Sequence, residues 1–364
     1  MNLYLDNIIF YLQNFGGISA YWDQIAVNFI SRSDVNIKFI EPLHLGAKFK
    51  ERSLIQRGLI IDDRKLPLSL VRYFPINKIN VLDNSIFHSS YFRYSTNKKV
   101  KNVITVYDFT YEYYMRGLAK RVHHWQKSLA IRKAAGIICI SENTKKDLLH
   151  FYPDLDEKNI KVIYLSADKS FKKIENLDIA TTRFKDLNGK KVVSFVGKRT
   201  EYKNFKMATE VIKKLPADYH LLIVGGGDIT NKEKATLASF ERRYTHMPDV
   251  NSEELNIVYN LSFCYLYPSE YEGFGIPILE AMQAGCPVIC QNVSSIPEVY
   301  GEVGNIVNGF NDVEEFCANI IKLESTDFRM GIIKRGTDNA SRFNWNKTGK
   351  ETFDFYNFLS GNIL

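Results

Sequence analysis

Two glutamates, Glu272 and Glu280, stand on either side of a glycine-rich turn that could hold a phosphate group. The turn lies in PSEYEGFGIPILEAMQAGCP, residues 268–287. Proline is favoured at the first helical position and glycine just after the last, so we expect a helix that opens at Pro277 and ends at Gly285. A glycine turn that leads into a helix N-terminus presents backbone amides to anions. Glu280 could instead only complement the helix dipole, but its small and apolar neighbours favour a functional carboxylate.

A second segment, VVSFVGKRTEYKNF at 192–205, supplies positive charge. Lys198, Arg199 and Lys203 follow an apolar strand candidate within a single loop. Cations at the carboxyl edge of a parallel sheet face the crevice where ligands bind. Arginine can hold phosphate oxygens bidentately, and lysine acts as a point charge. A solvated basic loop is the plain alternative, and the glycine turn in the same half of the chain favours a shared anion site.

Short apolar runs alternate with amphipathic stretches along the whole chain. We expect strands at 2–5, 36–40, 102–106, 136–140, 160–164, 191–196, 219–224, 262–267, 287–290 and 304–307. Continuously apolar short strands with helices between them indicate parallel sheets covered on both faces. The pattern therefore predicts two doubly wound, Rossmann-like α/β domains, with a polar linker near residues 167–189.

The composition excludes several classes of protein. Apolar residues make up 45% and charged residues 24% of the 364 residues, as in a folded protein with two cores. The charge sum, 48 basic against 41 acidic residues, is too small an excess to indicate nucleic-acid binding. The five cysteines show no Cys-x-x-Cys spacing and are read as reduced core thiols. We find neither a signal peptide nor a membrane-spanning run and predict a cytoplasmic protein.

These segments resemble the retaining glycosyltransferases of family 4, which have the GT-B fold. The resemblance rests on Glu272-x7-Glu280 within YEGFGIPILEAMQAGCPV, on SSIPEVYGEVG after it, and on VGKRTEYKNF. Looser matches are LLIVGGGD, VNSEELNIVYNLS, ICISENTKKDLL, NFGGISAYW and the closing FNWNKTGKETFDFY. The resemblance implies two Rossmann-like domains with a crevice between them. It assigns an acceptor-binding domain to 1–170, a nucleotide-sugar-binding domain to 171–345, and a helix at 346–364 that packs back on the N-terminal domain.

The resemblance also implies roles for single residues. Glu272 would contact the donor sugar beside the reaction centre, and Glu280 would hold the ribose hydroxyls. Arg199 and Lys203 would neutralise the diphosphate, with Lys198 in support. The remaining donor contacts implied by the resemblance come from backbone or from the turn itself: Gly16, Gly17, Val250, Gly273, Phe274, Gly275 and Ile276.

One departure from the family concerns the strand that ends at Val106. The family often has His-Asp at this point, whereas this chain has Tyr107-Asp108. Tyrosine can donate one hydrogen bond but is not a cation at neutral pH. Any role of that histidine in polarising the donor sugar is therefore in doubt, while Asp108 stays a catalytic candidate. Tyr107 and Ser141 are possible sugar contacts.

The resemblance implies a transferase that uses a UDP- or GDP-sugar and needs no metal or other cofactor. A departing diphosphate must be stabilised by a metal ion or by preorganised cations and amides, and the sequence offers the second set. The acidic triplet Asp154-Leu155-Asp156 lies far from the phosphate motifs and is not read as a metal site. No carboxylate is placed for a double displacement, so front-face attack by the acceptor follows from the family.

The acceptor is less defined. Residues 111–133 mix aromatic side chains with six basic ones, which fits either an anionic membrane surface or an ordinary surface helix. Membrane contact would suit a polyprenyl-linked saccharide acceptor in O-antigen or capsule assembly, with the protein peripheral on the inner face of the plasma membrane. Two other functions stay open: a GT-B nucleotide-sugar 2-epimerase, and a catalytically silent subunit that binds a nucleotide sugar.

Overall fold

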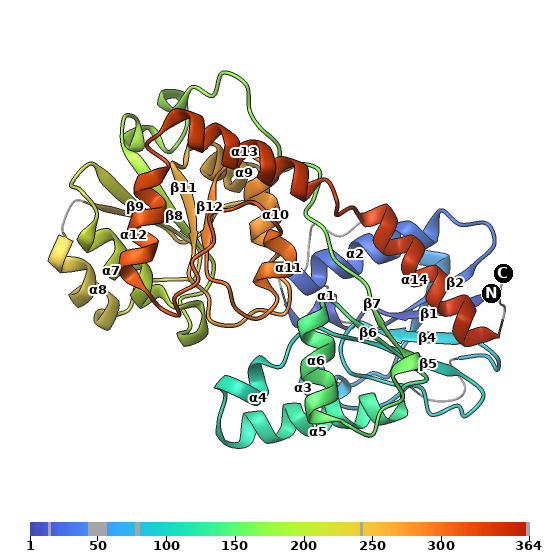
Figure 1. Ribbon diagram of the computed structural model, residues 1–364. Coiled ribbons are helices and arrows are strands. Elements are labelled where there is room, and N and C mark those ends of the chain that lie inside the picture. The colour runs from blue at the N-terminus through green and yellow to red at the C-terminus, as the bar shows by residue number, and fades with distance from the viewer. Residues whose placement is uncertain (14–15, 43–56, 77–80, 241–242, 362–364) are drawn as a thin grey trace. The chain divides into compact units, whose positions relative to one another are not determined.

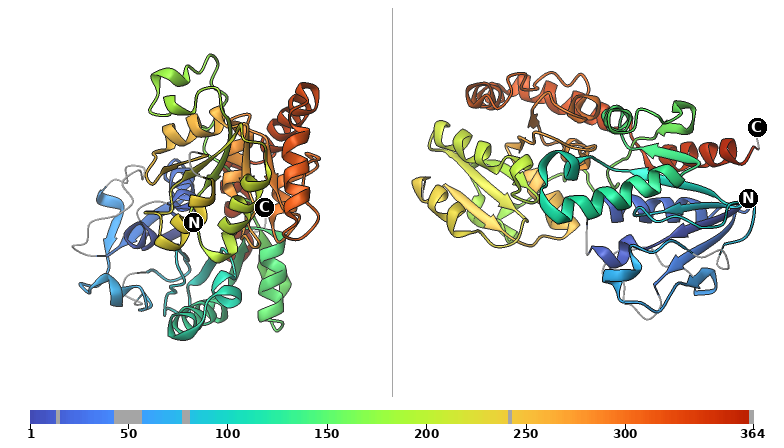
Figure 2. Two further views of the ribbon diagram at one scale, coloured as in Figure 1. Left: turned by 90° about the vertical axis from the view of Figure 1, so that its left-hand side faces the viewer. Right: turned by 90° about the horizontal axis from the view of Figure 1, so that it is seen from below.

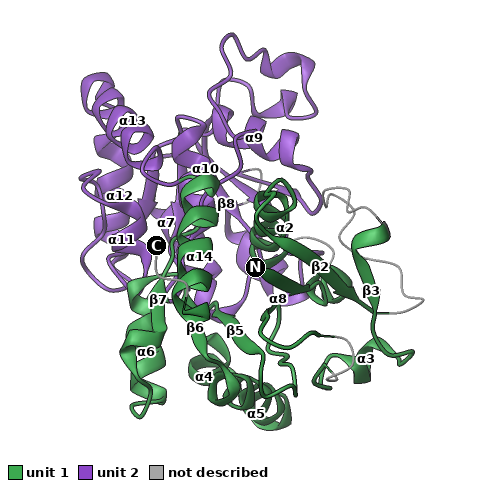
Figure 3. Cartoon of the chain, turned by 90° about the vertical axis from the view of Figure 1, so that its right-hand side faces the viewer, with its two compact units in different colours: residues 1–165, 344–364 green, residues 166–343 purple. Residues whose placement is uncertain are grey.

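The computed structural model describes residues 1–13, 16–42, 57–76, 81–240 and 243–361. These residues form two compact units, which Figure 3 distinguishes by colour. Unit 1 comprises residues 1–165 and 344–364, and unit 2 comprises residues 166–343. The predicted 167–189 linker thus falls inside unit 2, and the last helix belongs to unit 1.

Unit 1 is built on a parallel sheet of seven described strands in the order β3-β2-β1-β4-β5-β6-β7. The strands are β1 (Asn2–Asp6), β2 (Asn36–Glu41), β3 (Ile60–Asp62), β4 (Ile86–Ser89), β5 (Lys101–Val106), β6 (Gly136–Cys139) and β7 (Ile160–Val162). Its described helices are α1 (Ile9–Leu12), α2 (Gly17–Ile30), α3 (Leu68–Val71), α4 (Thr110–Tyr114), α5 (Gly117–Lys133), α6 (Glu142–Phe151) and α14 (Trp345–Ser360). Helices α2 and α14 pack together on one face of the sheet, and α5 covers the other (Figures 1 and 2).

Helix α14 is tied to the sheet of unit 1 by buried contacts. The imidazole of His88 in β4 forms hydrogen bonds with Tyr356 Oη at 2.5 Å and with Thr105 Oγ1 at 2.9 Å. A Cβ on Gly136 would clash with the side chains of Leu359 and Phe355, so the helix lies close to β6 at this glycine and a larger residue would force these side chains to shift. Burial lowers the pKa of His88 to about 3, and the ring therefore acts as a neutral hydrogen-bonding group.

Unit 2 is built on a parallel sheet of five described strands in the order β10-β9-β8-β11-β12. The strands are β8 (Lys191–Val196), β9 (Tyr219–Val224), β10 (Tyr244–Met247), β11 (Cys264–Tyr267) and β12 (Val288–Cys290). Its described helices are α7 (Phe205–Lys214), α8 (Asn231–Leu237), α9 (Ser252–Leu261), α10 (Ile276–Gln283), α11 (Ile296–Tyr300), α12 (Val313–Lys322) and α13 (Thr326–Ala340). Right-handed crossovers put α7 and α8 on one face and α9 and α10 on the other (Figure 1). The chain changes direction across the sheet between β8 and β11, which are neighbours.

Most of the predicted strands are present within a residue or two of their expected ends. The expected strand at 304–307 is wrong, because this segment contributes only an isolated bridge between Gln291 and Val307. Three strands were not predicted: β3 is very short, and β4 (IFHS) and β10 (YTHM) carry polar residues that break the apolar pattern. All five cysteines are buried and free. No described helix is long and apolar enough to cross a bilayer.

Candidate active site

The turn after β11 holds the first candidate residues in a fixed backbone conformation. Gly275 is the N-cap of α10 with φ 111°, a region that favours glycine, and a Cβ there would lie 3.2 Å from Ile278 Cδ1. No side chain caps the first amides of α10. The helix begins at Ile276, one residue before Pro277, and Gly285 follows its end with φ 73°. Pro277 has no N–H and the amide of Ile278 donates to the carbonyl of Gly275 at 3.0 Å, so the amide of Ile276 is the first that this turn can offer to an anion. Binding of a phosphate at this turn stays a prediction.

Two serines after β12 hold the backbone of this turn. The Ser294 hydroxyl accepts from the amide of Glu272 at 2.9 Å and donates to its carbonyl at 2.7 Å. The Ser295 hydroxyl lies within hydrogen-bond distance of the carbonyls of Glu272 and Phe274, at 2.9 and 3.0 Å. These serines were not among the site residues predicted from the sequence. The sequence does place both serines just after the apolar strand β12. Because β11 and β12 are parallel neighbours that end at the same edge of the sheet, this position could have predicted their contact with the turn after β11.

Glu272 and Lys203 form an ion pair at the point where the chain changes direction across the sheet. Lys203 Nζ lies 2.6 Å from Glu272 Oε1, and the two side chains are 19% and 11% exposed. The ammonium also lies 5.4 Å from the ring centroid of Tyr267. Lys203 follows β8 and Glu272 follows β11, so residues 69 positions apart meet at the crevice typical of ligand sites in open α/β sheets.

Glu280 lies one turn into α10 and accepts a hydrogen bond from Tyr259 Oη at 3.1 Å. Its side chain keeps some solvent access but is surrounded by protein. Desolvation raises the pKa of Glu280 to about 7, and the negative charge of Asp168 acts in the same direction. The carboxyl group therefore titrates near neutral pH and can accept or donate a hydrogen bond to a hydroxyl-bearing ligand.

Arg199, which was predicted to neutralise the diphosphate together with Lys203, is bonded to partners within unit 2. Its Nε donates to Glu233 at 2.7 Å, Nη1 donates to the carbonyl of Gly225 at 2.8 Å, and Nη2 donates to the carbonyls of Gly227 and Asp228 at 3.0 and 2.7 Å. The side chain is only 4% exposed. Arg199 therefore holds the turn after β9, and a phosphate contact would require it to leave these partners.

The other predicted donor contacts of unit 2 lie at the same edge of the sheet. Lys198 is exposed. Val250 precedes α9 and packs against an apolar cluster beneath β9. The amide of Gly225 donates to the carbonyl of Met247 at 2.8 Å, which joins the ends of β9 and β10. Gly273, Phe274 and Ile276 belong to the turn that the two serines hold.

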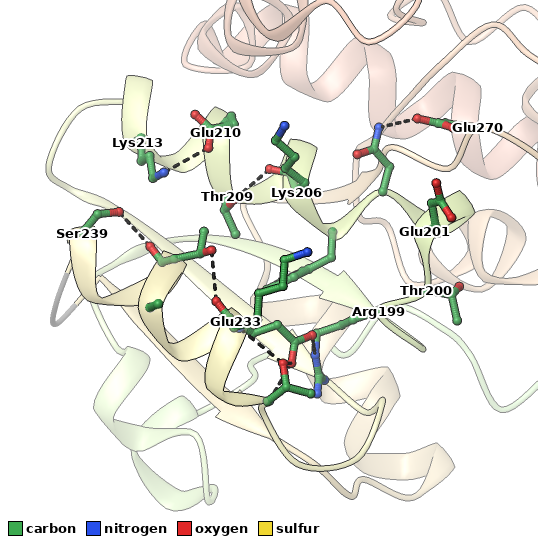
Figure 4. Close-up of a pocket in the computed structure, with 16 residues that line it drawn as sticks. Arg199, Thr200, Glu201, Lys206, Thr209, Glu210, Lys213, Glu233, Ser239 and Glu270 are labelled. Atoms are coloured by element: carbon green, nitrogen blue, oxygen red, sulfur yellow. Dashed lines mark hydrogen bonds and ion pairs between the residues drawn. The ribbon is translucent and has the colours of Figure 1, made fainter.

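A groove of about 1180 Å³ lies beside Arg199 but is separate from the ion pair. It runs between α7 and α8 and is lined by Lys206, Lys213, Glu201 and Glu270 among others (Figure 4). Of the residues predicted to bind the donor, it includes Arg199 alone. The groove is thus not the predicted donor site.

In unit 1 the candidate residues follow different strands of the sheet, and several are already engaged. Tyr107 is buried and donates to the carbonyl of Ser90 at 3.1 Å, and burial raises its pKa well above the usual value. Ser141 caps α6 by accepting from the amide of Thr144 at 2.9 Å. Both hydroxyls therefore have partners within the fold, and their contact with a sugar stays a prediction.

Asp108 and the two glycines have other surroundings. Asp108 Oδ1 accepts from the amide of Thr110 at 2.9 Å, and its carbonyl accepts from Lys127 Nζ at 2.6 Å. Gly16 is the N-cap of α2 with extended backbone, φ 165°, and Gly17 is the first residue of that helix. A Cβ on Gly16 would meet only the end of the Gln13 side chain, at 2.9 Å. Across the described residues, no group of three or more His, Cys, Asp or Glu is arranged to hold a metal ion.

Comparison with known proteins points to glycosyltransferases. Residues 178–339 match the family model described as glycosyl transferases group 1. Solved structures that resemble the whole chain include sucrose-phosphate synthase from Thermosynechococcus elongatus, with a TM-score of 0.77, 15% identity and 100% of each chain covered. The chain has the GT-B fold. WaaG, a glycosyltransferase involved in lipopolysaccharide biosynthesis, has a TM-score of 0.69 and 13% identity over 98% of this GT-B chain and 99% of its own. Anabaena HepE, solved in complex with UDP and glucose, has a TM-score of 0.72 and 16% identity over 97% and 98%.

Two relatives by sequence are mannosyltransferases. O-antigen chain mannosyltransferase B of Escherichia coli is 38% identical over 128 residues, which are 35% of this chain and 32% of that protein. O-antigen chain mannosyltransferase RfbU of Salmonella typhimurium is 27% identical over 269 residues, 72% of this chain and 68% of that protein. The chain thus aligns with about a third of the length of the first relative and about two thirds of the second.

Proposed function

We propose that this protein is a retaining glycosyltransferase that moves a hexose, with mannose the first candidate, from a nucleoside diphosphate sugar to a saccharide acceptor. The observation that carries the proposal is the Lys203–Glu272 pair beside the uncapped N-terminus of α10. Two of its relatives are named as O-antigen chain mannosyltransferases, and HepE was solved with UDP and glucose. Membership of family 4 and a role for the Glu272-x7-Glu280 spacing are part of the same proposal.

The chemistry requires charge stabilisation on the leaving diphosphate. As the bond from the sugar's anomeric carbon to the phosphate oxygen breaks, negative charge grows on that oxygen. Lys203 and the first amides of α10 would stabilise that charge without a metal ion. The acceptor oxygen attacks from the face that the phosphate leaves, its bond to the anomeric carbon forms, and its proton passes to the departing phosphate oxygen.

The two carboxyl groups would act on different parts of the donor. Glu272 would hold sugar hydroxyls and, through its ion pair, keep Lys203 oriented before the donor binds. Glu280 would bind the ribose hydroxyls, for which a group that both accepts and donates is suited. Asp108 would contact the sugar or the acceptor from unit 1.

The donor can be identified with a thermal-shift screen of GDP-mannose, UDP-glucose, UDP-galactose and UDP-N-acetylglucosamine. A ligand at 100 times its Kd stabilises the folded protein by about 2.7 kcal/mol, so the true donor should raise the melting temperature clearly. NMR of the product would then give its anomeric configuration. An inverted product would contradict retention, and epimerisation of the donor without acceptor would favour the 2-epimerase.

We also propose a lipid-linked acceptor and contact with an anionic membrane through α4 and α5. Exposed apolar side chains on this segment include Leu118 at 75% and Trp125 at 55% exposure. Arg116 and Arg121 are exposed beside them. Apolar and basic groups together bind anionic interfaces. Sedimentation with phosphatidylglycerol vesicles but not with phosphatidylcholine vesicles is expected, and Leu118→Ser with Trp125→Ser should abolish it.

A further inference from the structure

We infer that unit 1 carries a saccharide-binding subsite formed by Arg72, Tyr91, Tyr111, His123 and Gln126, which we call the His123 cluster. The inference rests on the proposed function, because it supplies a place for the acceptor of that reaction.

The cluster is continuous through its own contacts. Gln126 Nε2 donates to the carbonyl of Arg72 at 2.7 Å. The Arg72 guanidinium carbon lies 5.2 Å from the ring centroid of Tyr91, whose ring lies 6.2 Å from that of His123. His123 in turn stacks on Tyr111, with 3.8 Å between ring centroids and 12° between ring planes.

Three buried polar atoms of the cluster have no hydrogen-bond partner in the part of the chain that the structure describes. They are Arg72 Nε, His123 Nδ1 and Gln126 Oε1. Gln126 itself is only 4% exposed. A buried polar atom without a hydrogen-bond partner destabilises the folded state by about 1–3 kcal/mol. Three such atoms within one cluster therefore indicate that a bound ligand supplies the missing partners.

The chemistry of these three atoms fits hydroxyl groups. Arg72 Nε donates, Gln126 Oε1 accepts, and His123 Nδ1 can do either according to its tautomer. Burial and the charge of Lys127 lower the pKa of His123 to about 4, so its ring is neutral at pH 7. A saccharide hydroxyl is both donor and acceptor, and the flat rings of the cluster suit a sugar face. The charges that act on His123 balance, Lys127 and Arg72 against Glu112 and Asp108, so the cluster has no excess charge that would favour an ionic ligand over a neutral saccharide.

The cluster also lies where ligands bind in folds of this kind. Tyr91 follows β4 and Tyr111 follows β5, and these strands are parallel neighbours whose carboxyl ends share one edge of the sheet. Asp108, which the sequence analysis proposed as a contact for the sugar or the acceptor, stands between β5 and Tyr111.

Histidine-ring NMR with disaccharides tests the subsite directly. The probes are α-1,3-mannobiose, maltose and N,N'-diacetylchitobiose, each titrated into the full chain with and without UDP or GDP. His123→Ala assigns the His123 signal. We expect at least one disaccharide to shift that signal in a saturable way, and Gln126→Met should raise its Kd at least tenfold. His124→Ala, an exposed neighbour on the same helix, is the matched control and should leave the Kd unchanged.

The outcomes separate the subsite from the proposed function. If no disaccharide shifts the His123 signal, or if Gln126→Met binds like the wild type, the subsite is refuted and the three atoms are satisfied by water. Arg72→Lys, which removes the Nε–H but keeps the charge, replaces Gln126→Met if that variant does not fold. Calorimetry of nucleotide binding on the same samples reports on the donor site alone, so its loss would count against the proposed function and not against the subsite.

Discussion

Arg199 and Lys203 stand four residues apart in one loop, and their substitution should have different effects. Arg199→Ala should mainly reduce the stability of unit 2, because the guanidinium holds the turn at 225–228 and pairs with Glu233. Lys203→Ala should mainly reduce sugar transfer, because this ammonium lies at the edge where the leaving phosphate is proposed to sit.

The structure gives the size of each effect. Arg199 is 4% exposed and its removal strands Glu233 and three carbonyls, so we expect a loss of about 3–5 kcal/mol in the free energy of unfolding. In a domain of this size that loss lowers the melting temperature by roughly 6–20 °C. Lys203 pairs with Glu272 at a partly exposed site, so its removal should destabilise by about 1–2 kcal/mol. Its loss at the transition state should slow transfer by about 30- to 1000-fold.

Thermal unfolding and initial rates, measured on the same preparations, separate the two roles. Arg199→Lys keeps a positive charge, but an ammonium cannot donate to Glu233 and the three carbonyls at once as the planar guanidinium does. Its melting temperature should therefore be nearly as low as that of Arg199→Ala. Lys206→Ala, an exposed lysine at the start of α7, is the control and should match the wild type in both assays. If Arg199→Ala melts like the wild type yet loses transfer a hundredfold, the guanidinium is a phosphate ligand and does not stabilise the turn after β9.

Three further outcomes are expected. Glu272→Gln should lower kcat by at least a hundredfold while nucleotide binding measured by calorimetry stays within a few-fold, and Glu302→Gln, an exposed control, should change neither. The pKa of Glu280 is raised from its usual 4.5 to about 7, so folding favours the protonated group and stability falls as pH rises between these values. Urea unfolding at pH 5 and pH 7.5 should show a fall on the order of 3 kcal/mol from this group that Glu280→Gln removes, and an equal fall in that variant would contradict the assignment. Transfer should persist in EDTA, and a complete loss that Mg²⁺ or Mn²⁺ restores would overturn the metal-independent mechanism.

Apolar periodicity was enough to predict the two parallel sheets, because strands buried on both faces leave an uninterrupted signal. The same signal explains the errors. The segment GNIV at 304–307 ends in two apolar β-branched residues but forms a single bridge. By contrast, β4 contains histidine and serine, and β10 contains threonine and histidine, within short strands. Two of these polar side chains have partners distant in sequence, since His88 bonds to Tyr356 and Thr245 bonds to His220, and a local pattern does not reveal such partners.

Residue types and spacing located the candidate site but did not fix side-chain partners. The loop sequence placed Arg199 and Lys203 together, and their shared charge suggested a shared ligand. Arg199 points to the turn after β9 because three backbone carbonyls of that turn and Glu233 of α8 accept its hydrogen bonds. These partners lie in other elements, so the loop sequence alone did not reveal them. The hydroxyl of Ser141 was likewise read as a sugar contact, although an N-cap at the start of a helix was an equally local use for it.

The division of unit 1 into residues 1–165 and 344–364 affects the order in which the two units can fold during synthesis on the ribosome. Unit 2 is a continuous segment and can fold as soon as it has emerged, since domains generally fold as units during synthesis. The sheet of unit 1 is translated earlier, yet it must wait for α14 to cover His88 and Gly136. Until α14 has been translated, the apolar face of the sheet that it covers is exposed and can bind chaperones or other nascent chains. Stalled or truncated chains that end before residue 344 should therefore aggregate through their N-terminal half, although the residues that they lack are far from that half in the sequence.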